Sequence, residues 1–202
     1  FRAWHIFSNR PEVKGKGLLW PHMNFQDPAG WNLDHLIDQI GMRNQSIIYY
    51  NKVAHATHEM DLMPEEELAK LYQIADAFIL ISGEGFGLPT LEAMATGVPC
   101  ILTDYAASSE LGADGRAEMI PVTDFATWTG VHLTQRPIPR PEAVADAMAR
   151  VFSDADRRRD MEARGREFAM RYDWKKVVGE FNAVFMDQEV PFLRPQTLEV
   201  IS

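Results

Sequence analysis

Two short apolar runs, separated by a glycine-rich loop and a helix-sized segment, constrain the fold of this chain more than any other feature. Residues 77–82 and 99–103 are almost uninterrupted apolar runs, which is typical of parallel strands covered on both faces. Between them, residues 89–96 predict a helix, with Pro89 as its first residue and Gly97 as its C-terminal cap. The strand–helix–strand order predicts a single doubly wound, Rossmann-like α/β domain with a parallel sheet.

The remaining segments mostly continue this alternation of strands and helices. A helix is expected to begin at Pro64, because three acidic residues follow it and suit the positive end of a helix. Further strands are predicted at residues 3–7, 46–50 and 118–122, and further helices at residues 32–40, 142–152 and 157–185.

Composition narrows the class of protein. The 202 residues are 46% hydrophobic and 24% charged, as in an ordinary globular domain. The net charge of −9 argues against a nucleic-acid partner, which needs a basic surface. Cys100 is the one cysteine, so an intramolecular disulfide is impossible and a reducing compartment is expected. No apolar run approaches the roughly 18 residues that span a bilayer.

The loop after the first apolar run has the chemistry of a ligand site. Residues 82–97 read SGEGFGLPTLEAMATG, with glycines at 83, 85 and 87. This spacing differs from the G-x-G-x-x-G of dinucleotide sites, Glu84 would repel a close pyrophosphate, and the Gly-Lys-Ser/Thr of a P-loop is missing. Backbone N–H groups in such a loop, at the start of a helix, attract a phosphate or a sugar oxygen.

Two carboxylates flank these N–H groups. Glu84 lies in the loop and Glu92 lies eight residues later on the predicted helix. A carboxylate accepts hydrogen bonds from adjacent hydroxyls, each contributing roughly 1.5–3 kcal/mol where water is excluded. The pattern therefore suits a ligand with a polyol at each end of a diphosphate.

Residues 84–99 resemble a known family motif. They read EGFGLPTLEAMATGVP and are similar to E-G-F-G-L-P-x-L-E-A-M-A-x-G-x-P, from the donor-binding half of the retaining, two-domain (GT-B) glycosyltransferases of family 4. Residues 71–76, 101–110 and 172–174 resemble the family pattern around this motif. The resemblance is good over residues 46–185 and weak over the first 45.

The resemblance implies roles for individual residues. Glu84 would contact the transferred sugar, and Glu92 would hold the ribose of the nucleotide. Arg10 and a lysine would neutralise the diphosphate leaving group in place of a metal, so no metal or other cofactor is implied. Lys16 is favoured over Lys14 by its spacing, although both precede a glycine. The loop N–H groups facing the sugar and diphosphate would be those of Gly85, Phe86, Gly87 and Leu88.

The resemblance also implies partners and organisation. The donor substrate would be a nucleotide sugar such as a UDP- or GDP-sugar, transferred with retention to a hydroxyl. Residues 1–186 would form the nucleotide-sugar-binding domain of a longer bacterial protein, and residues 187–202 a tail crossing to an amino-terminal domain. That domain would carry the site for a glycan or lipid-linked acceptor. The cytoplasm, or the cytoplasmic face of a membrane, is the expected location.

Some positions depart from the family pattern. Ser82 lies two residues before Glu84 instead of three, and Ala106-Ala107 replaces the usual glycine pair. Two alternatives to a glycosyltransferase also stay open: a non-catalytic nucleotide-sugar-binding or assembly subunit, and half of a sugar-nucleotide epimerase, which the E-G-F-G-L-P match disfavours.

Two charged segments receive simple interpretations. His55, His58 and Glu59 do not follow a zincin order and are expected in a polar loop that contacts the nucleobase. The arginines at 157–159 alternate with acidic residues, which predicts a solvated helix face.

Overall fold

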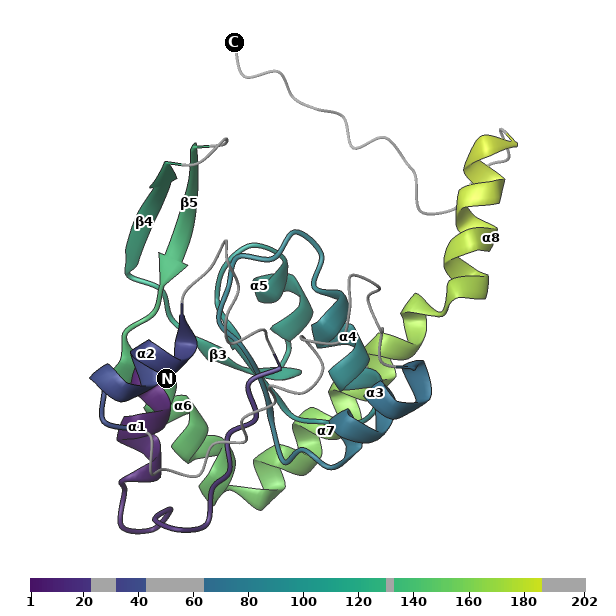
Figure 1. Cartoon of the computed structure of the whole chain (residues 1–202). Coiled ribbons are helices and arrows are strands. Elements are labelled where there is room, and N and C mark those ends of the chain that lie inside the picture. Colours follow the sequence, from purple (N-terminus) through teal and green to yellow (C-terminus); the bar gives the residue numbers. More distant parts are fainter. Residues whose placement is uncertain (23–31, 43–63, 130–132, 187–202) are drawn as a thin grey trace.

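A computed structural model of the chain describes residues 1–22, 32–42, 64–129 and 133–186 (Figure 1). The helices are α1 (Arg2–Ser8), α2 (Leu33–Gln39), α3 (Glu65–Gln73), α4 (Leu88–Ala95), α5 (Ala107–Gly112), α6 (Pro141–Ser153), α7 (Ala155–Ala169), the 3-10 helix η1 (Met170–Tyr172) and α8 (Trp174–Phe185). The strands are β1 (Phe78–Leu80), β2 (Cys100–Thr103), β3 (Ala117–Ile120), β4 (Asp124–Thr129) and β5 (Leu133–Ile138).

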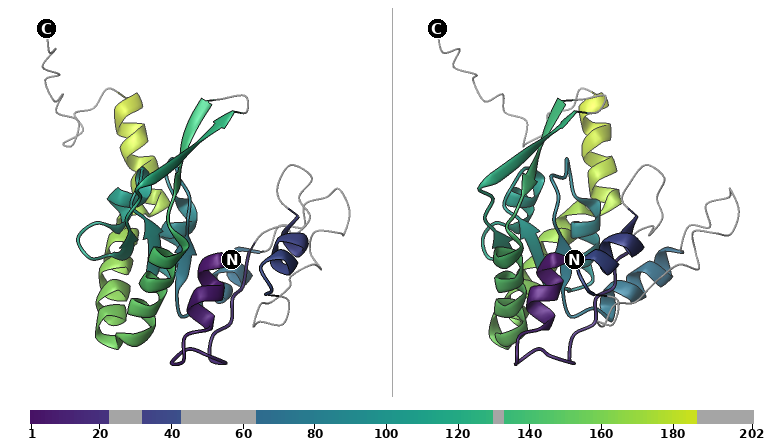
Figure 2. Two further views of the ribbon diagram at one scale, coloured as in Figure 1. Left: turned by 90° about the vertical axis from the view of Figure 1, so that its left-hand side faces the viewer. Right: turned by 60° about the vertical axis from the view of Figure 1, so that its left-hand side comes forward.

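The first three strands form a parallel sheet in the order β1-β2-β3. Cys100 at the start of β2 lies opposite Phe78 on one side and Ala117 on the other. Strands β4 and β5 pair with each other as a separate antiparallel hairpin, which projects beyond the sheet in Figures 1 and 2. The predicted doubly wound parallel sheet is confirmed.

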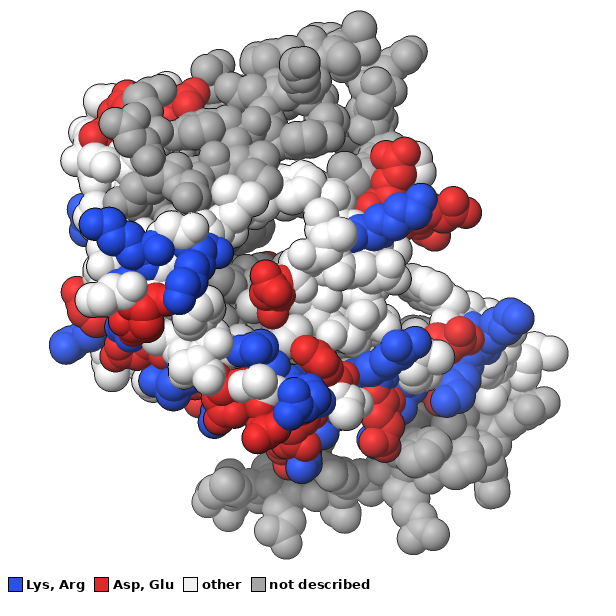
Figure 3. All heavy atoms as spheres, turned by 90° about the horizontal axis from the view of Figure 1, so that it is seen from below, with Lys and Arg blue, Asp and Glu red and all other residues white. Residues whose placement is uncertain are grey.

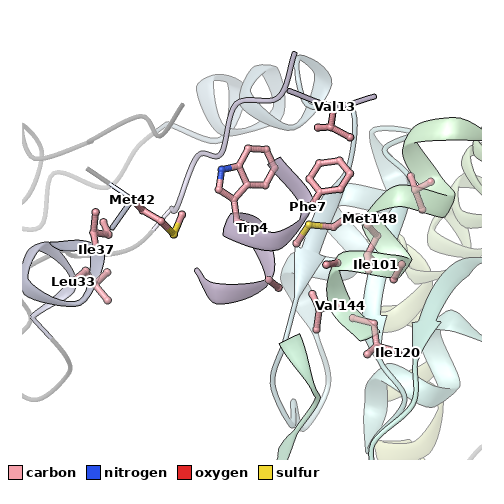
Figure 4. Packing of buried hydrophobic residues seen from close by; sticks show 14 of the residues in the cluster. Trp4, Phe7, Val13, Leu33, Ile37, Met42, Ile101, Ile120, Val144 and Met148 are labelled. Carbon is pink, nitrogen blue, oxygen red and sulfur yellow. The ribbon is translucent and has the colours of Figure 1, made fainter. Parts of the chain in front are cut away.

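Alternate residues of β2 enter different hydrophobic cores, one on each face of the sheet. Ile101 belongs to the core beneath α1, α2 and α6, whereas Leu102 belongs to the core beneath α4, α5 and α7. Cys100 lies in the second core, and burial raises the pKa of its thiol to about 12, so it stays a neutral core side chain. In Figure 4, Trp4 and Phe7 of α1 lie between the residues of α2 and those of α6.

Helix α4 is closed by a two-bond cap. Gly97 has a φ of +81°, a left-handed conformation that favours glycine. Its N–H donates to the carbonyl of Met94, and the N–H of Val98 donates to that of Ala93, each over 3.0 Å. This is the Schellman arrangement, and it confirms Gly97 as the C-terminal cap.

Two sequence-based predictions about secondary structure are wrong. Residues 3–7 lie in helix α1, because Ala3, Trp4 and Phe7 are buried at helical spacing and a short apolar run does not distinguish a helix from a strand. The predicted helix over 157–185 is interrupted at η1. Asp173 then begins α8 by accepting a hydrogen bond from the N–H of Lys175.

Two elements were missed, and other expectations fall outside the described residues. The sequence did not indicate helix α5 or the β4–β5 hairpin. The predicted strand at 46–50 and the tail at 187–202 lie outside the described residues, so the domain limits of 1–186 and 187–202 stay a prediction.

The arginines at 157–159 have different partners, so the predicted solvated face holds only in part. Arg159 pairs with the exposed Asp156, but Arg157 pairs with Glu118 of β3, whose side chain is 4% exposed. Glu118 also accepts a 2.7 Å bond from Arg150 of α6, which joins β3, α6 and α7. Figure 3 shows that cationic and acidic side chains are interspersed over the face seen from below.

Arg157→Met is expected to lower the free energy of unfolding by about 1–2 kcal/mol, because it removes one of the two arginine partners of the buried Glu118 carboxylate. The matched control Arg159→Met should cost less than about 0.5 kcal/mol, since its partner is exposed. Urea denaturation of both variants measures the difference, and equal losses would contradict the structural role of the Glu118 pair.

Candidate functional site

The loop of residues 82–87 joins β1 to α4 at the carboxyl edge of the sheet, where α/β folds bind ligands. Ser82 Oγ donates to Oε1 of Glu84 over 2.8 Å. The N–H of Ala107, at the start of α5, donates to the carbonyl oxygen of Glu84 over 3.3 Å. The half-buried Glu84 is therefore held through its side chain and its backbone. The side-chain bond comes from Ser82, which lies two residues before Glu84 instead of the three of the family pattern.

Gly87 makes the turn from this loop into α4. It precedes the helix with a φ of +92° and is buried. A Cβ at this position would lie 2.8 Å from Cδ1 of Leu111 in α5. Only glycine fits both the backbone conformation and the space, so the loop can pack tightly against α5. The helix begins at Leu88, one residue before the predicted Pro89.

Gly87→Ala is expected to destabilise the fold by about 2 kcal/mol, through backbone strain and the contact with Leu111. Gly85→Ala is the matched control, because a Cβ there meets nothing within 4 Å and should change stability by less than about 0.5 kcal/mol. Thermal and urea unfolding of the two variants would show the difference, and similar losses would argue against the tight turn.

Polar groups around the turn lack partners within the described part of the chain. The N–H groups of residues 85–88 donate to no described carbonyl or side chain. Thr90 is fully buried in the first turn of α4, 3.7 Å from the Cβ position at Gly87, and its Oγ1 has no described hydrogen-bond partner. Such a loop can receive an anion or sugar oxygens at the positive end of the helix.

Glu92 lies one turn further along α4, on an exposed position. Tyr72 of α3 donates its phenolic hydrogen bond to Oε2 of Glu92 over 3.0 Å. Burial, followed by the hydrogen bond and charge of Glu92, raises the pKa of Tyr72 above its ordinary value, so the hydroxyl stays protonated. The structure thus brings Glu84, the loop N–H groups and Glu92 into one loop–helix unit, although their roles toward a ligand stay predictions.

Tyr105 and the β4–β5 hairpin flank the other side of the loop. A Cβ at Gly83 would lie 3.0 Å from the ring of Tyr105 and 3.3 Å from Pro137 of β5. The Tyr105 ring packs edge-on against Phe125 of β4, with ring centroids 5.4 Å apart. The sequence analysis did not predict this contact between Tyr105, the hairpin and the loop. The available signal was the run of threonines and aromatic residues at 124–129, which is typical of a strand. Pro137 in the partner strand suits an edge position.

Phe86 connects the loop to the junction before α8. Its side chain is 52% exposed, and its ring meets the Tyr172 ring edge-on at 5.9 Å. Tyr172 packs in turn on Phe168 of α7. Two segments that separately carried the family resemblance, 84–99 and 172–174, are therefore in contact.

The alanine pair after β2 carries backbone strain. Ala106 precedes α5 with a φ of +52° and a ψ of −138°, a region that favours glycine. The sequence-level departure from a glycine pair thus falls on a position whose backbone still has the glycine conformation. Strain of this kind costs about 1–3 kcal/mol.

Ala106→Gly is expected to raise the free energy of unfolding by about 0.5–1 kcal/mol, because the relief of strain exceeds the added entropy of the unfolded chain. Ala107→Gly, one residue later in the helical conformation, should lower it by about 0.5–1 kcal/mol. Opposite signs in urea titrations would support the assignment, whereas destabilisation by both would contradict it.

The predicted diphosphate cations are not brought to this loop. Arg10 pairs with Asp146 of α6, and Lys14 and Lys16 follow it in consecutive turns. Figures 1 and 2 show this segment, purple and just after α1, at the end of the molecule opposite the β4–β5 hairpin. Their part in binding stays a prediction.

Metal and membrane features were sought in the described residues. There, no group of three or more His, Cys, Asp or Glu side chains is placed to hold a metal ion. His55, His58 and Glu59 lie outside the described residues. None of the described helices is both long enough and apolar enough to cross a membrane.

Comparison with known proteins identifies the family. The family model described as "Glycosyl transferases group 1" matches residues 52–168, more than half of the 202 residues. The chain belongs to this family of glycosyltransferases.

Curated relatives agree with this family. The chain is 31% identical over 126 residues to D-inositol 3-phosphate glycosyltransferase of Corynebacterium urealyticum, covering 62% of this chain and 26% of the relative. It is 43% identical over 119 residues to O-antigen chain mannosyltransferase B of Escherichia coli, covering 55% and 31% respectively. The chain thus matches about a quarter to a third of the length of these relatives.

Solved structures support the fold. WaaG, a glycosyltransferase involved in lipopolysaccharide biosynthesis, is similar with a TM-score of 0.60 at 14% identity, covering 91% of this chain and 42% of that one. Sucrose-phosphate synthase from Thermosynechococcus elongatus is similar with a TM-score of 0.59 at 19% identity, covering 80% and 36%. The expected GT-B type of α/β fold is confirmed.

Proposed function

We propose that this chain is the donor-binding part of a retaining glycosyltransferase that transfers a sugar from a nucleotide diphosphate to a hydroxyl acceptor. The observation that carries the proposal is the loop–helix unit at the carboxyl edge of the sheet, in which Glu84 and Glu92 flank N–H groups that donate to no partner among the described residues. Membership of the group 1 glycosyltransferases supports it.

Each part of the unit has a place in this reaction. Glu92 accepts hydrogen bonds from the ribose hydroxyls, and Glu84 accepts one from the transferred sugar. The N–H groups of residues 85–88 hold the diphosphate and stabilise the charge that grows on it as it leaves. The positive ends of these N–H groups do part of the work that a metal does elsewhere, so the proposal requires no metal.

Retention follows from attack on the face that the leaving group vacates. The bond from the anomeric carbon to the diphosphate oxygen breaks, and its electron pair stays on the diphosphate. The acceptor oxygen bonds to the same face of the anomeric carbon, and its proton passes to the departing diphosphate. This course needs no covalent protein nucleophile.

The cationic side chains near the N-terminus are secondary candidates for binding the diphosphate. Arg10 and one of Lys14 or Lys16 remain candidate diphosphate ligands, but their segment would have to move to the loop from the opposite end of the molecule, and Arg10 would have to give up its ion pair with Asp146. The N–H groups near Gly87 have no such partner to give up among the described residues. The loop is therefore the primary diphosphate site.

The curated relatives suggest the first donor and acceptor to test. Several are mannosyltransferases by name, and one is named for GDP-mannose and a diphosphopolyprenol acceptor. Because the relatives are three to four times longer than their match to this chain, we assign the glycan or lipid-linked acceptor to another part of the protein. The chain alone should bind the donor without turnover.

Calorimetric titration with UDP, GDP, ADP and their sugar conjugates tests the proposal, with GDP-mannose first. One nucleotide should bind, and Glu92→Gln should weaken it about tenfold through the lost ribose contacts. Glu84→Gln should weaken the sugar conjugate and leave the free nucleotide unchanged.

Glu66→Gln, on the exposed first turn of α3, is the matched control for a lost surface charge and should leave both affinities unchanged. Binding that is insensitive to Glu92→Gln would contradict the ribose assignment. Failure of the chain to bind any of the nucleotides would contradict the donor site itself.

A further inference from the structure

The hydrogen bond between Tyr72 and Glu92 joins two helices at the proposed ribose site. Tyr72 Oη lies 3.0 Å from Oε2 of Glu92. Tyr72 lies on α3, while Glu92 lies on α4, and these helices are separated in sequence by β1 and the glycine loop. The contact therefore exists only in the folded chain and ties the carboxylate to a second element.

The tyrosine ring is itself fixed by packing. It meets the Phe78 ring of β1 edge-on, with centroids 5.8 Å apart, and packs against the core beneath α4. The side chain of Tyr72 is only partly exposed, whereas Glu92 is exposed. The fixed hydroxyl of Tyr72 thus holds the Glu92 carboxylate, which would otherwise exchange between rotamers in water.

The phenol of Tyr72 is a suitable hydrogen-bond partner for a carboxylate that must also bind a ligand. A phenol donates one hydrogen bond and brings no positive charge, so the contact leaves the second oxygen Oε1 of Glu92 and further lone pairs available to a ligand. Among the described residues, no cation pairs with Glu92. The carboxylate is oriented without being neutralised.

We propose that Tyr72 is a positioning residue for nucleotide binding, which holds Glu92 in the rotamer that accepts both hydroxyls of a ribose. The inference rests on the proposed function, because it requires Glu92 to contact the ribose. Tyr72 itself acts through the carboxylate and does not touch the nucleotide.

The test compares nucleotides with and without the ribose diol. GDP and UDP are titrated beside their 2′,3′-dideoxy counterparts into the wild-type chain, Tyr72→Phe, Glu92→Gln and the double variant. Tyr72→Phe keeps the ring and its packing on Phe78 and removes only the hydroxyl. It should weaken the ribonucleotide about threefold to tenfold and leave the dideoxynucleotide unchanged.

The double variant separates positioning from a structural role. The quantity to compare is the ratio of the affinities for the ribonucleotide and the dideoxynucleotide. If Tyr72 acts through Glu92, this ratio should be no smaller in the double variant than in Glu92→Gln alone, because the carboxylate that Tyr72 positions is already lost. A structural role would instead weaken both nucleotides equally or lower the unfolding midpoint of Tyr72→Phe.

The outcomes distinguish this inference from the proposed function. Unchanged diol discrimination in Tyr72→Phe, together with reduced discrimination in Glu92→Gln, would overturn the positioning role and leave the ribose site intact. Unchanged discrimination in Glu92→Gln, or no nucleotide binding by the wild-type chain, would overturn the ribose assignment and this inference with it.

Discussion

The parallel pairing of the half-buried β1 with the fully buried β2 is the constraint on which the rest of the structure depends. Because the two strands run in the same direction, the segments that follow them leave the sheet at the same edge. That is why the N–H of Ala107 reaches the carbonyl of Glu84. The two cores fix the register, since a slip of one residue would send each side chain of β2 to the opposite core.

Three glutamates of this chain show how environment separates a structural carboxylate from the two carboxylates that we propose bind a ligand. Glu118 is buried and forms ion pairs with two arginines, so its carboxylate serves to hold the fold together. Glu84 and Glu92 accept hydrogen bonds from the neutral hydroxyls of Ser82 and Tyr72. A hydroxyl orients a carboxylate and leaves it charged, which is what recognition of a sugar or ribose hydroxyl requires.

The sequence predicted the centre of the fold well and its margins poorly. β1, α4 and β2 are predictable because the two apolar runs, the proline near the helix start and the capping glycine all indicate the same structure. The segment at 3–7 failed because a short apolar run suits a helix or a strand, and its burial depends on α6, far along the chain. The break at Asp173 is a local capping signal that helical periodicity on both sides concealed.

The sequence by itself determined the parallel α/β class, the glycine loop and the two carboxylates, because these depend on local pattern and on residue chemistry. Tertiary structure alone decided which groups meet them: Tyr72 beside Glu92, Leu111 against Gly87, Tyr172 against Phe86 and the hairpin beside Gly83. It also put Arg10 in an ion pair with Asp146, in the segment after α1 that lies at the opposite end of the described structure from the hairpin. The physical reason is that such contacts join segments far apart in sequence, and packing, which local patterns do not encode, selects them.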